Sequence, residues 1–224
     1  MKTKSNILNR LAKMKITALA AMAATALLSP PAHASDTDND GDDFHFDLIR
    51  SAGLAKFPKV APDAHGKVNI ESLGPVEVMT VKVWGLPPNT DFDLFVIQVP
   101  NAPFGLAWYQ GDIETNKDGV GYGQFIGRFS IETFIVAPGI ANAPADPFHD
   151  PKRIPDALQN PATNPVQTYH LGLWFNNPQD VVKAGGPNTV TPFNGEHDAG
   201  VQVLNSGLYL PTDGPLKRVT TSGN

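Results

Sequence analysis

Residues 76–100 hold two runs of β-branched, aliphatic and aromatic side chains on either side of a tight segment, residues 85–90. Such runs, bounded by glycine and proline, are typical of β-strands that meet at a sharp turn. Apolar residues fall on both faces of each run, as in interior strands that are covered on both sides. We therefore expect a central hairpin within a two-layer β-sandwich.

The rest of the chain also favours an all-β fold. Its 224 residues include 20 glycines, 21 prolines and no cysteine. Frequent turn residues favour many short strands, and the lack of cysteine excludes disulfides, thiolate metal sites and thiol catalysis. The predicted fold is one all-β domain, an immunoglobulin-like or jelly-roll-type β-sandwich with a long proline-rich loop and one short helix.

Residues 1–34 are expected to be a secretory signal peptide. They carry five basic residues and no acidic one, then an apolar run at residues 16–28, with the small residues Ala32 and Ala34 before Ser35. The apolar run is short for a membrane span, although an uncleaved anchor is the alternative. No later run is long enough to span a bilayer, so the mature protein is expected to be secreted or periplasmic.

The charge balance argues against nucleic acid as a partner. The full chain has a net charge of −5, and removal of the five basic residues of the signal leaves −10. Binding to phosphates needs a basic surface, which this composition does not supply.

Four segments follow along the chain: the signal peptide at 1–34, an acidic leader and linker at 35–59, a sandwich domain at 60–210 and a frayed tail at 211–224. Carboxylates alternate before Gly41, an arrangement that can offer oxygen ligands to calcium. The candidate ligands are Asp36, Asp38, Asp40, Asp42 and Asp47. Phe44 stands at the ninth loop position and no helix flanks it, so a solvated tail is the competing interpretation. No other cofactor is predicted.

Further runs of apolar and aromatic residues predict strands at 68–72, 106–113, 122–136, 168–175 and 201–205. Residues 44–57 fit either a strand or an amphipathic turn. Residues 137–167 contain seven prolines, which is typical of a long functional or mobile loop. Residues 177–185 begin with an asparagine cap and a proline and end in glycine, which predicts a short helix.

The segment between the first two runs resembles the corner of fibronectin type III and immunoglobulin-like domains, where the chain crosses between sheets. The matching residues are Leu86, Pro88, Thr90, Phe92 and Leu94, and Phe92 replaces the usual tyrosine of that corner. The mature chain, with DFDLFV, AWYQGDI, IGRFSIETFIVAPG and FNGEHDAGVQVLN, resembles uncharacterised secreted bacterial β-rich proteins. That resemblance implies export and a β fold and supplies no functional residue.

Aromatic side chains are the first candidates for a binding surface. Trp108, Tyr109 and Trp174 can form a platform for a sugar ring or for an apolar patch of a partner. His170 shares a strand face with Trp174, so both join the surface if that face is wet. The alternative is that these large aromatics belong to the core.

Glu196 and His197 form the most polar late cluster and can serve as a base and the group that orients it, or as two metal ligands. Adjacent residues of an extended segment point to opposite faces, so they converge only if their loop curls. No serine-hydrolase elbow, phosphate loop or paired-histidine motif is present. Glycosidase chemistry needs two facing carboxylates, for which Asp112, Glu114, Glu132 and Glu196 are available.

We therefore expect an exported, non-catalytic protein with a binding or structural role at the cell envelope or outside the cell. Its partners are expected to be a polysaccharide or another envelope protein. The alternative is a secreted hydrolase that depends on carboxylates or a metal, with its pocket under the loop at 137–167.

Overall fold

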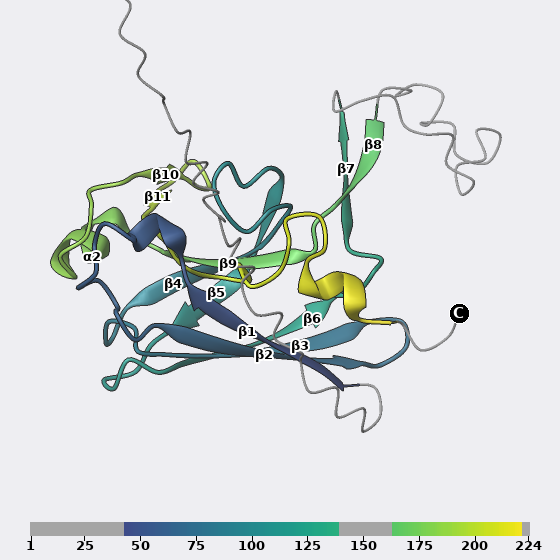
Figure 1. The fold of residues 1–224 in the computed structure, drawn as a ribbon, viewed down its shortest axis with the longest axis horizontal. Helices are drawn as coiled ribbons and strands as arrows, with labels where there is room; N and C mark the ends of the chain where they lie inside the picture. Colours follow the sequence, from purple (N-terminus) through teal and green to yellow (C-terminus); the bar gives the residue numbers. More distant parts are fainter. Residues whose placement is uncertain (1–42, 139–162, 221–224) are drawn as a thin grey trace, which may run out of the picture. The chain divides into compact units, whose positions relative to one another are not determined.

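The structure, a computed structural model, describes residues 43–138 and 163–220 (Figure 1). The strands are β1 (Asp43–Arg50), β2 (His65–Ser72), β3 (Glu77–Trp84), β4 (Asp91–Ile97), β5 (Ala107–Glu114), β6 (Gly121–Gly127), β7 (Phe134–Pro138), β8 (Thr163–Gln167), β9 (His170–Phe175), β10 (Thr191–Pro192), β11 (Asp198–Ala199) and β12 (Gln202–Asn205). The short helices are η1 (Ala52–Leu54), α2 (Pro178–Lys183) and η2 (Pro215–Arg218). In these two ranges no helix is long and apolar enough to cross a membrane.

Eight strands form one antiparallel sheet in the order β5-β4-β9-β12-β1-β2-β3-β6. The sheet curls until its two edge strands approach each other, and Thr115 pairs with Gly121 at that seam. Strands from the two halves of the sheet therefore face each other across one core, as Figure 1 shows. The prediction of an all-β, sandwich-like fold is confirmed.

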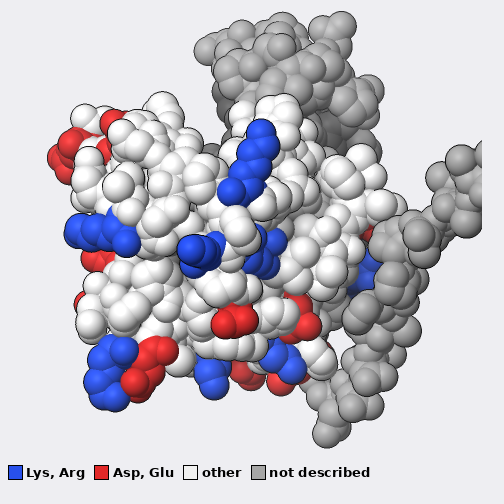
Figure 2. All heavy atoms as spheres, turned by 60° about the vertical axis from the view of Figure 1, so that its left-hand side comes forward, with Lys and Arg blue, Asp and Glu red and all other residues white. Residues whose placement is uncertain are grey.

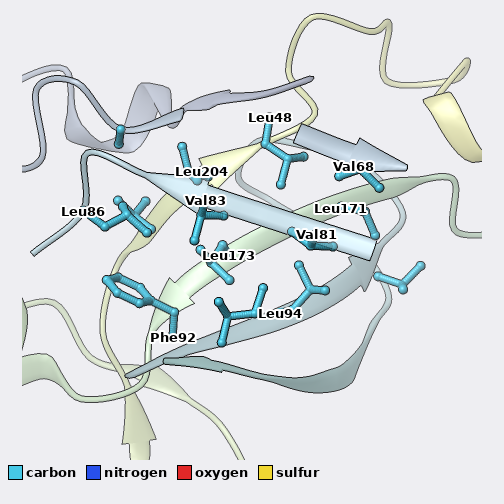
Figure 3. Packing of buried hydrophobic residues seen from close by; sticks show 14 of the residues in the cluster. Leu48, Val68, Val81, Val83, Leu86, Phe92, Leu94, Leu171, Leu173 and Leu204 are labelled. Atoms are coloured by element: carbon cyan, nitrogen blue, oxygen red, sulfur yellow. The ribbon is translucent and has the colours of Figure 1, made fainter. Parts of the chain in front are cut away.

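The core is built from the alternating residues that point to the inside of the curled sheet. Met79, Val81 and Val83 on β3 are fully buried and face Phe92 and Leu94 on β4. Figure 3 shows how leucines and valines from β1, β2, β9 and β12 complete the packing between these strands.

The central hairpin predicted for residues 76–100 is wrong. β3 pairs with β2 and β6, whereas β4 pairs with β5 and β9, so the two strands lie in different halves of the sheet. Thr115 holds the crossing, because its hydroxyl donates to the carbonyl of Pro87 at 2.7 Å and accepts from the amide of Thr90 at 3.0 Å. The segment is therefore a corner that joins the two halves of the curled sheet.

β3 and β4 also differ in how they are covered. On β3 only the inward face is buried, and Lys82 on the other face is exposed, so the expectation of cover on both faces is wrong for this strand. β4 is buried on both faces, since Phe92, Leu94 and Val96 face the core and Asp93 and Ile97 are buried on the opposite side. That opposite side, the outer face of β4, requires a second covering layer.

The single long strand predicted at 122–136 is wrong, because it breaks into β6 and β7. A turn separates them, in which the amide of Ser130 donates to the hydroxyl of Thr133 at 2.8 Å. The buried carboxylate of Glu77 stabilises this turn, because it accepts a hydrogen bond from the amide of Phe129 at 2.7 Å. β7 continues as a ribbon with β8, and most of the proline-rich loop, residues 139–162, lies outside the described residues.

The boundaries predicted at both ends of the domain are also wrong. Within the segment predicted to be leader and linker, residues 43–50 form β1, which pairs with both β12 and β2 and buries Leu48 completely. In the predicted frayed tail, η2 buries Leu216 fully and Val219 follows it into the core. A few buried apolar side chains dock each of these short elements on the core. The predicted short helix is confirmed as α2, which Asn177 caps.

Candidate functional site

The outer face of β4 and β9 carries a second aromatic cluster. Phe95 lies at its centre, with its ring centroid 5.2 Å from that of Trp174, 5.8 Å from that of Tyr109 and 5.5 Å from that of Phe193. The buried members are Ile97, Trp174 and Ala199, with Phe104 packed against Trp174 at 4.9 Å. This cluster is the second layer that covers the outer face of β4.

The loop at residues 191–200 supplies the outermost ring of this cluster. β10 and β11 pair at its base, and the side chain of Asn194 accepts hydrogen bonds from the amides of Glu196 and His197 at 2.9 and 3.0 Å. Gly195 takes the positive φ of 87° that this tight turn requires. The loop therefore curls back, and the imidazole of His197 lies 5.0 Å from the ring of Phe193 and 2.7 Å from the side-chain oxygen of Asn176.

A β-bulge brings an acid and a phenol together on this face. Leu94 pairs with Gly111 and Phe95 pairs with Tyr109, so Gln110 is an extra residue in β5. In a regular strand, residues three apart point to opposite faces. The bulge places both Tyr109 and Asp112 on the outer face, where the Tyr109 hydroxyl donates to the Asp112 carboxylate at 2.6 Å.

These side chains surround an open pocket with a volume of about 460 Å³. Its lining combines aromatic, acidic, amide and imidazole groups, and we call it the outer-face pocket. The residues that line it are Phe95, Ala107, Tyr109, Asp112, Asn176, Phe193, Asn194 and His197.

A second carboxyl lies behind this pocket. Asp93 on β4 is directly opposite Asp112 on β5 and opposite Trp174 on β9. Its side chain is fully buried, and neither carboxyl oxygen has a hydrogen-bond partner. Burial, and then the charge of Asp112, raise the pKa of Asp93 from 3.8 to about 7. Burial and the hydrogen bond to Asp112 also raise the pKa of Tyr109 far above its ordinary value.

The structure brings some of the predicted site residues together. Tyr109 and His197 both line the outer-face pocket, and Trp174 is buried directly beneath it. Phe95 and Phe193 join these three side chains. Glu196 is exposed in the same loop and does not line the pocket.

Two other predicted residues lie elsewhere. Trp108 is half-buried on the inward side of β5, where its indole donates to Gln110 at 3.1 Å. His170 is fully buried, with its ring nitrogens 2.9 Å from the Ser206 hydroxyl and 3.1 Å from the carbonyl of Leu210. The face shared by His170 and Trp174 is therefore covered, and neither residue is at the surface.

The candidate calcium ligands Asp36, Asp38, Asp40 and Asp42 lie outside the described residues, and Asp47 is an exposed residue of β1. Within residues 43–138 and 163–220, no three His, Asp or Glu side chains gather as a metal site would need. A calcium loop in the leader therefore remains a prediction.

Sequence reasoning missed several residues in and behind the pocket, among them Asp93, Phe95, Asn176 and Phe193. Asp93 did carry a signal, because it is an acid at the centre of the apolar run DFDLF. An acid in a strand covered on both faces is uncommon and often functional.

Comparisons of the chain with protein-family models, curated proteins and solved structures give no match. The chemistry of the outer-face pocket therefore has to be argued from its own residues.

Proposed function

We propose that this protein is an exported, non-catalytic binding protein and that the outer-face pocket is its ligand site. The observation that carries this proposal is the convergence of Tyr109 and Phe193 with Asp112, Asn176 and His197 around one open pocket. Aromatic walls with a few placed polar groups are typical of ligand sites. Such a pocket suits part of a polysaccharide or a polar side chain of an envelope partner.

Export is supported by the sequence of residues 1–34, which has the basic, apolar and small-residue regions of a signal peptide. The lack of cysteine is compatible with an oxidising compartment, since no thiol is available for unwanted pairing. We propose a secreted or periplasmic location on these grounds. On the face seen in Figure 2, acidic and basic side chains are interspersed and form no continuous basic patch.

Burial of Asp93 supports binding over catalysis. A general acid or base must come within hydrogen-bond reach of its substrate. Asp93 is fully buried. Asp112, which lines the pocket, already accepts a hydrogen bond from the hydroxyl of Tyr109. His197 is likewise engaged by Asn176. These contacts fix the orientation of the polar groups of the pocket, as a binding site requires.

Ligand-dependent thermal stability tests the site. A ligand that binds only the native protein raises its melting temperature. The full chain is screened against soluble polysaccharide fragments, amines and short peptides, with Tyr109→Ala as the pocket variant. Tyr122→Ala is the matched control, because Tyr122 is 62% exposed on β6 and Tyr109 is 43% exposed on β5. We expect Tyr109→Ala to abolish a ligand-induced shift that Tyr122→Ala retains, and equal shifts in both variants contradict the proposal.

A secreted carboxylate- or metal-dependent hydrolase is the second candidate, and the facing pair Asp93 and Asp112 is the observation that favours it. Two carboxyls whose surroundings separate their pKa values can act as acid and base. The predicted position of that pocket, under the loop at 137–167, lies largely outside the described residues. Turnover of chromogenic glycosides or esters that is lost in Asp112→Asn and in Asp93→Asn favours this candidate, whereas binding without turnover removes it.

A further inference from the structure

The outer-face pocket lies beside an accumulation of negative charge. Asp91 faces Glu114 and Asp93 faces Asp112 across β4 and β5. Like charges directly opposite each other in a sheet are destabilising. The described residues that line the pocket include no lysine or arginine. The site therefore lacks a compensating cation of its own.

Asp93 gives a second observation, from the buried side of the pocket wall. Its carboxyl is fully buried, and both of its oxygens lack a hydrogen-bond partner. An unpaired buried carboxylate is strongly unfavourable, so such a group either stays protonated or is compensated by a cation. Its cross-strand partner Asp112 and its neighbour on the same face, Phe95, both line the outer-face pocket. The unpaired carboxyl thus lies directly behind the pocket wall.

The aromatic walls suit a cation with apolar substituents. The rings of Tyr109 and Phe193 are 5.0 Å apart and inclined at 75°, so that they form a corner. Phe95 closes its base, at 5.8 Å from Tyr109 and 5.5 Å from Phe193. Ring faces attract a cation within about 6 Å of their centroids, and cages of inclined rings bind substituted ammonium groups.

We propose that the ligand of the outer-face pocket carries a substituted ammonium group, which lies in the corner of Tyr109 and Phe193 with Asp112 as its counter-ion. This inference rests on the proposed binding function and names the chemical class of the ligand. Asp93 lies behind Asp112, away from the bound cation, and does not contact it. A neutral sugar can form hydrogen bonds with Asn176 and Asn194 but leaves the carboxylate of Asp112 without a counter-ion.

Choline and its neutral isostere 3,3-dimethyl-1-butanol have nearly the same shape and differ in charge. Comparing them therefore separates the contribution of the positive charge to binding from that of the shape. The full chain is titrated with each by calorimetry at constant ionic strength, and its melting temperature is measured in parallel. We expect choline to bind and to raise the melting temperature, and the isostere to do neither. Asp112→Asn and Tyr109→Leu are expected to weaken choline binding at least tenfold, while Tyr122→Leu, on β6, binds as the wild type does.

Equal binding of choline and the isostere overturns the inference, because the charge then contributes nothing. Binding of a neutral saccharide that Tyr109→Leu abolishes, with no binding of choline, also overturns it but leaves the proposed function standing. Binding of calcium alone, lost in Asp112→Asn, replaces the organic cation with a metal ion. If neither choline nor any member of the ligand panel binds, the inference and the proposed function both fail.

Discussion

Asp93 and Asp112 face each other across β4 and β5, and one is fully buried while the other is exposed to the outer-face pocket. The bulge at Gln110 leaves this pair in register and adds Tyr109 to the same face. A buried acid, an exposed acid and a phenol thus share a small area of sheet. The stability of the fold and the chemistry of the pocket are coupled through Asp93.

Asp93→Asn should make the protein more stable at alkaline pH. The folded-state pKa of Asp93 is raised from 3.8 to about 7, so the native protein holds this proton more tightly than the unfolded chain does. The resulting stabilisation is complete below the unfolded value and is lost as the pH rises through about 7. Because a tenfold difference in proton affinity is worth about 1.4 kcal/mol, the loss amounts to as much as about 4 kcal/mol.

Urea unfolding at about pH 5 and about pH 8 measures this effect. We expect wild type and Asp93→Asn to differ little at the lower pH and the variant to be the more stable at the higher pH. Asp47→Asn, at an exposed position of β1, is the control and should behave as the wild type does. Parallel pH profiles for wild type and Asp93→Asn would show that Asp93 is not protonated in the native protein.

His170→Ala should destabilise the fold without weakening binding at the outer-face pocket. The variant loses the hydrogen bonds to Ser206 and to the carbonyl of Leu210 and leaves a cavity. Losses of this kind lower the free energy of unfolding by about 2–4 kcal/mol. Calorimetric unfolding and a choline titration of the same sample separate the two effects, and a variant of normal stability that fails to bind contradicts this assignment.

The pKa of His170 also affects how the free energy of unfolding depends on pH in acidic solution. Burial lowers the pKa of His170 below 6.5, so the native protein favours the neutral ring. The stabilisation is present above the unfolded pKa and is lost as the pH falls through the folded one. We expect the loss of stability below pH 6.5 to be smaller in His170→Asn than in wild type. If the free energy of unfolding falls equally in both proteins at acidic pH, groups other than His170 cause the loss.

Local sequence patterns predicted the strands but not their neighbours. The alternation of Met79, Val81 and Val83 was enough to predict β3, and the punctuation around Asn177 was enough for α2. The segment 85–90 looks like a hairpin turn because glycine and proline reverse or redirect a chain equally well. Whether the flanking strands pair depends on β9, about eighty residues further along the chain.

The outer-face pocket was only half predictable for the same reason. Tyr109, Trp174 and His197 were candidates because of their chemistry, but their convergence depends on long-range pairing and on one extra residue, Gln110. A bulge leaves little trace in hydrophobic periodicity, because it shifts the alternation by a single position. His170 was misplaced because an alternating strand does not reveal that both of its faces are covered.

Gly111→Ala should destabilise the bulge. A Cβ at this position lies 2.6 Å from the ring of Phe125, and the backbone has a φ of 150°. Gly185→Ala is the matched control, since φ there is 83° and nothing lies within 4 Å of its Cβ. Urea unfolding should show a loss larger in Gly111→Ala than in the control by about 1–3 kcal/mol. Phe125→Leu in the Gly111→Ala background should recover part of it, and no recovery means that the contact is not the cause.

Phe193→Ala should uncover the aromatic cluster while the main core persists. Phe193 contacts Phe95, Tyr109 and His197, and its removal takes the outermost ring from above Trp174. Truncation of a half-buried aromatic lowers the free energy of unfolding by about 1–3 kcal/mol. Val190→Ala is the control. Val190 is 52% exposed just before β10, so its truncation should lower the free energy of unfolding by less than about 0.5 kcal/mol.

The fluorescence of Trp174 measures the same change at the cluster itself. Its emission, obtained as the difference from the same protein with Trp174→Phe, should shift to longer wavelength in Phe193→Ala and not in Val190→Ala. An unshifted emission would mean that the loop at 191–200 does not depend on this ring, and that the corner proposed to hold the ligand is not fixed by Phe193.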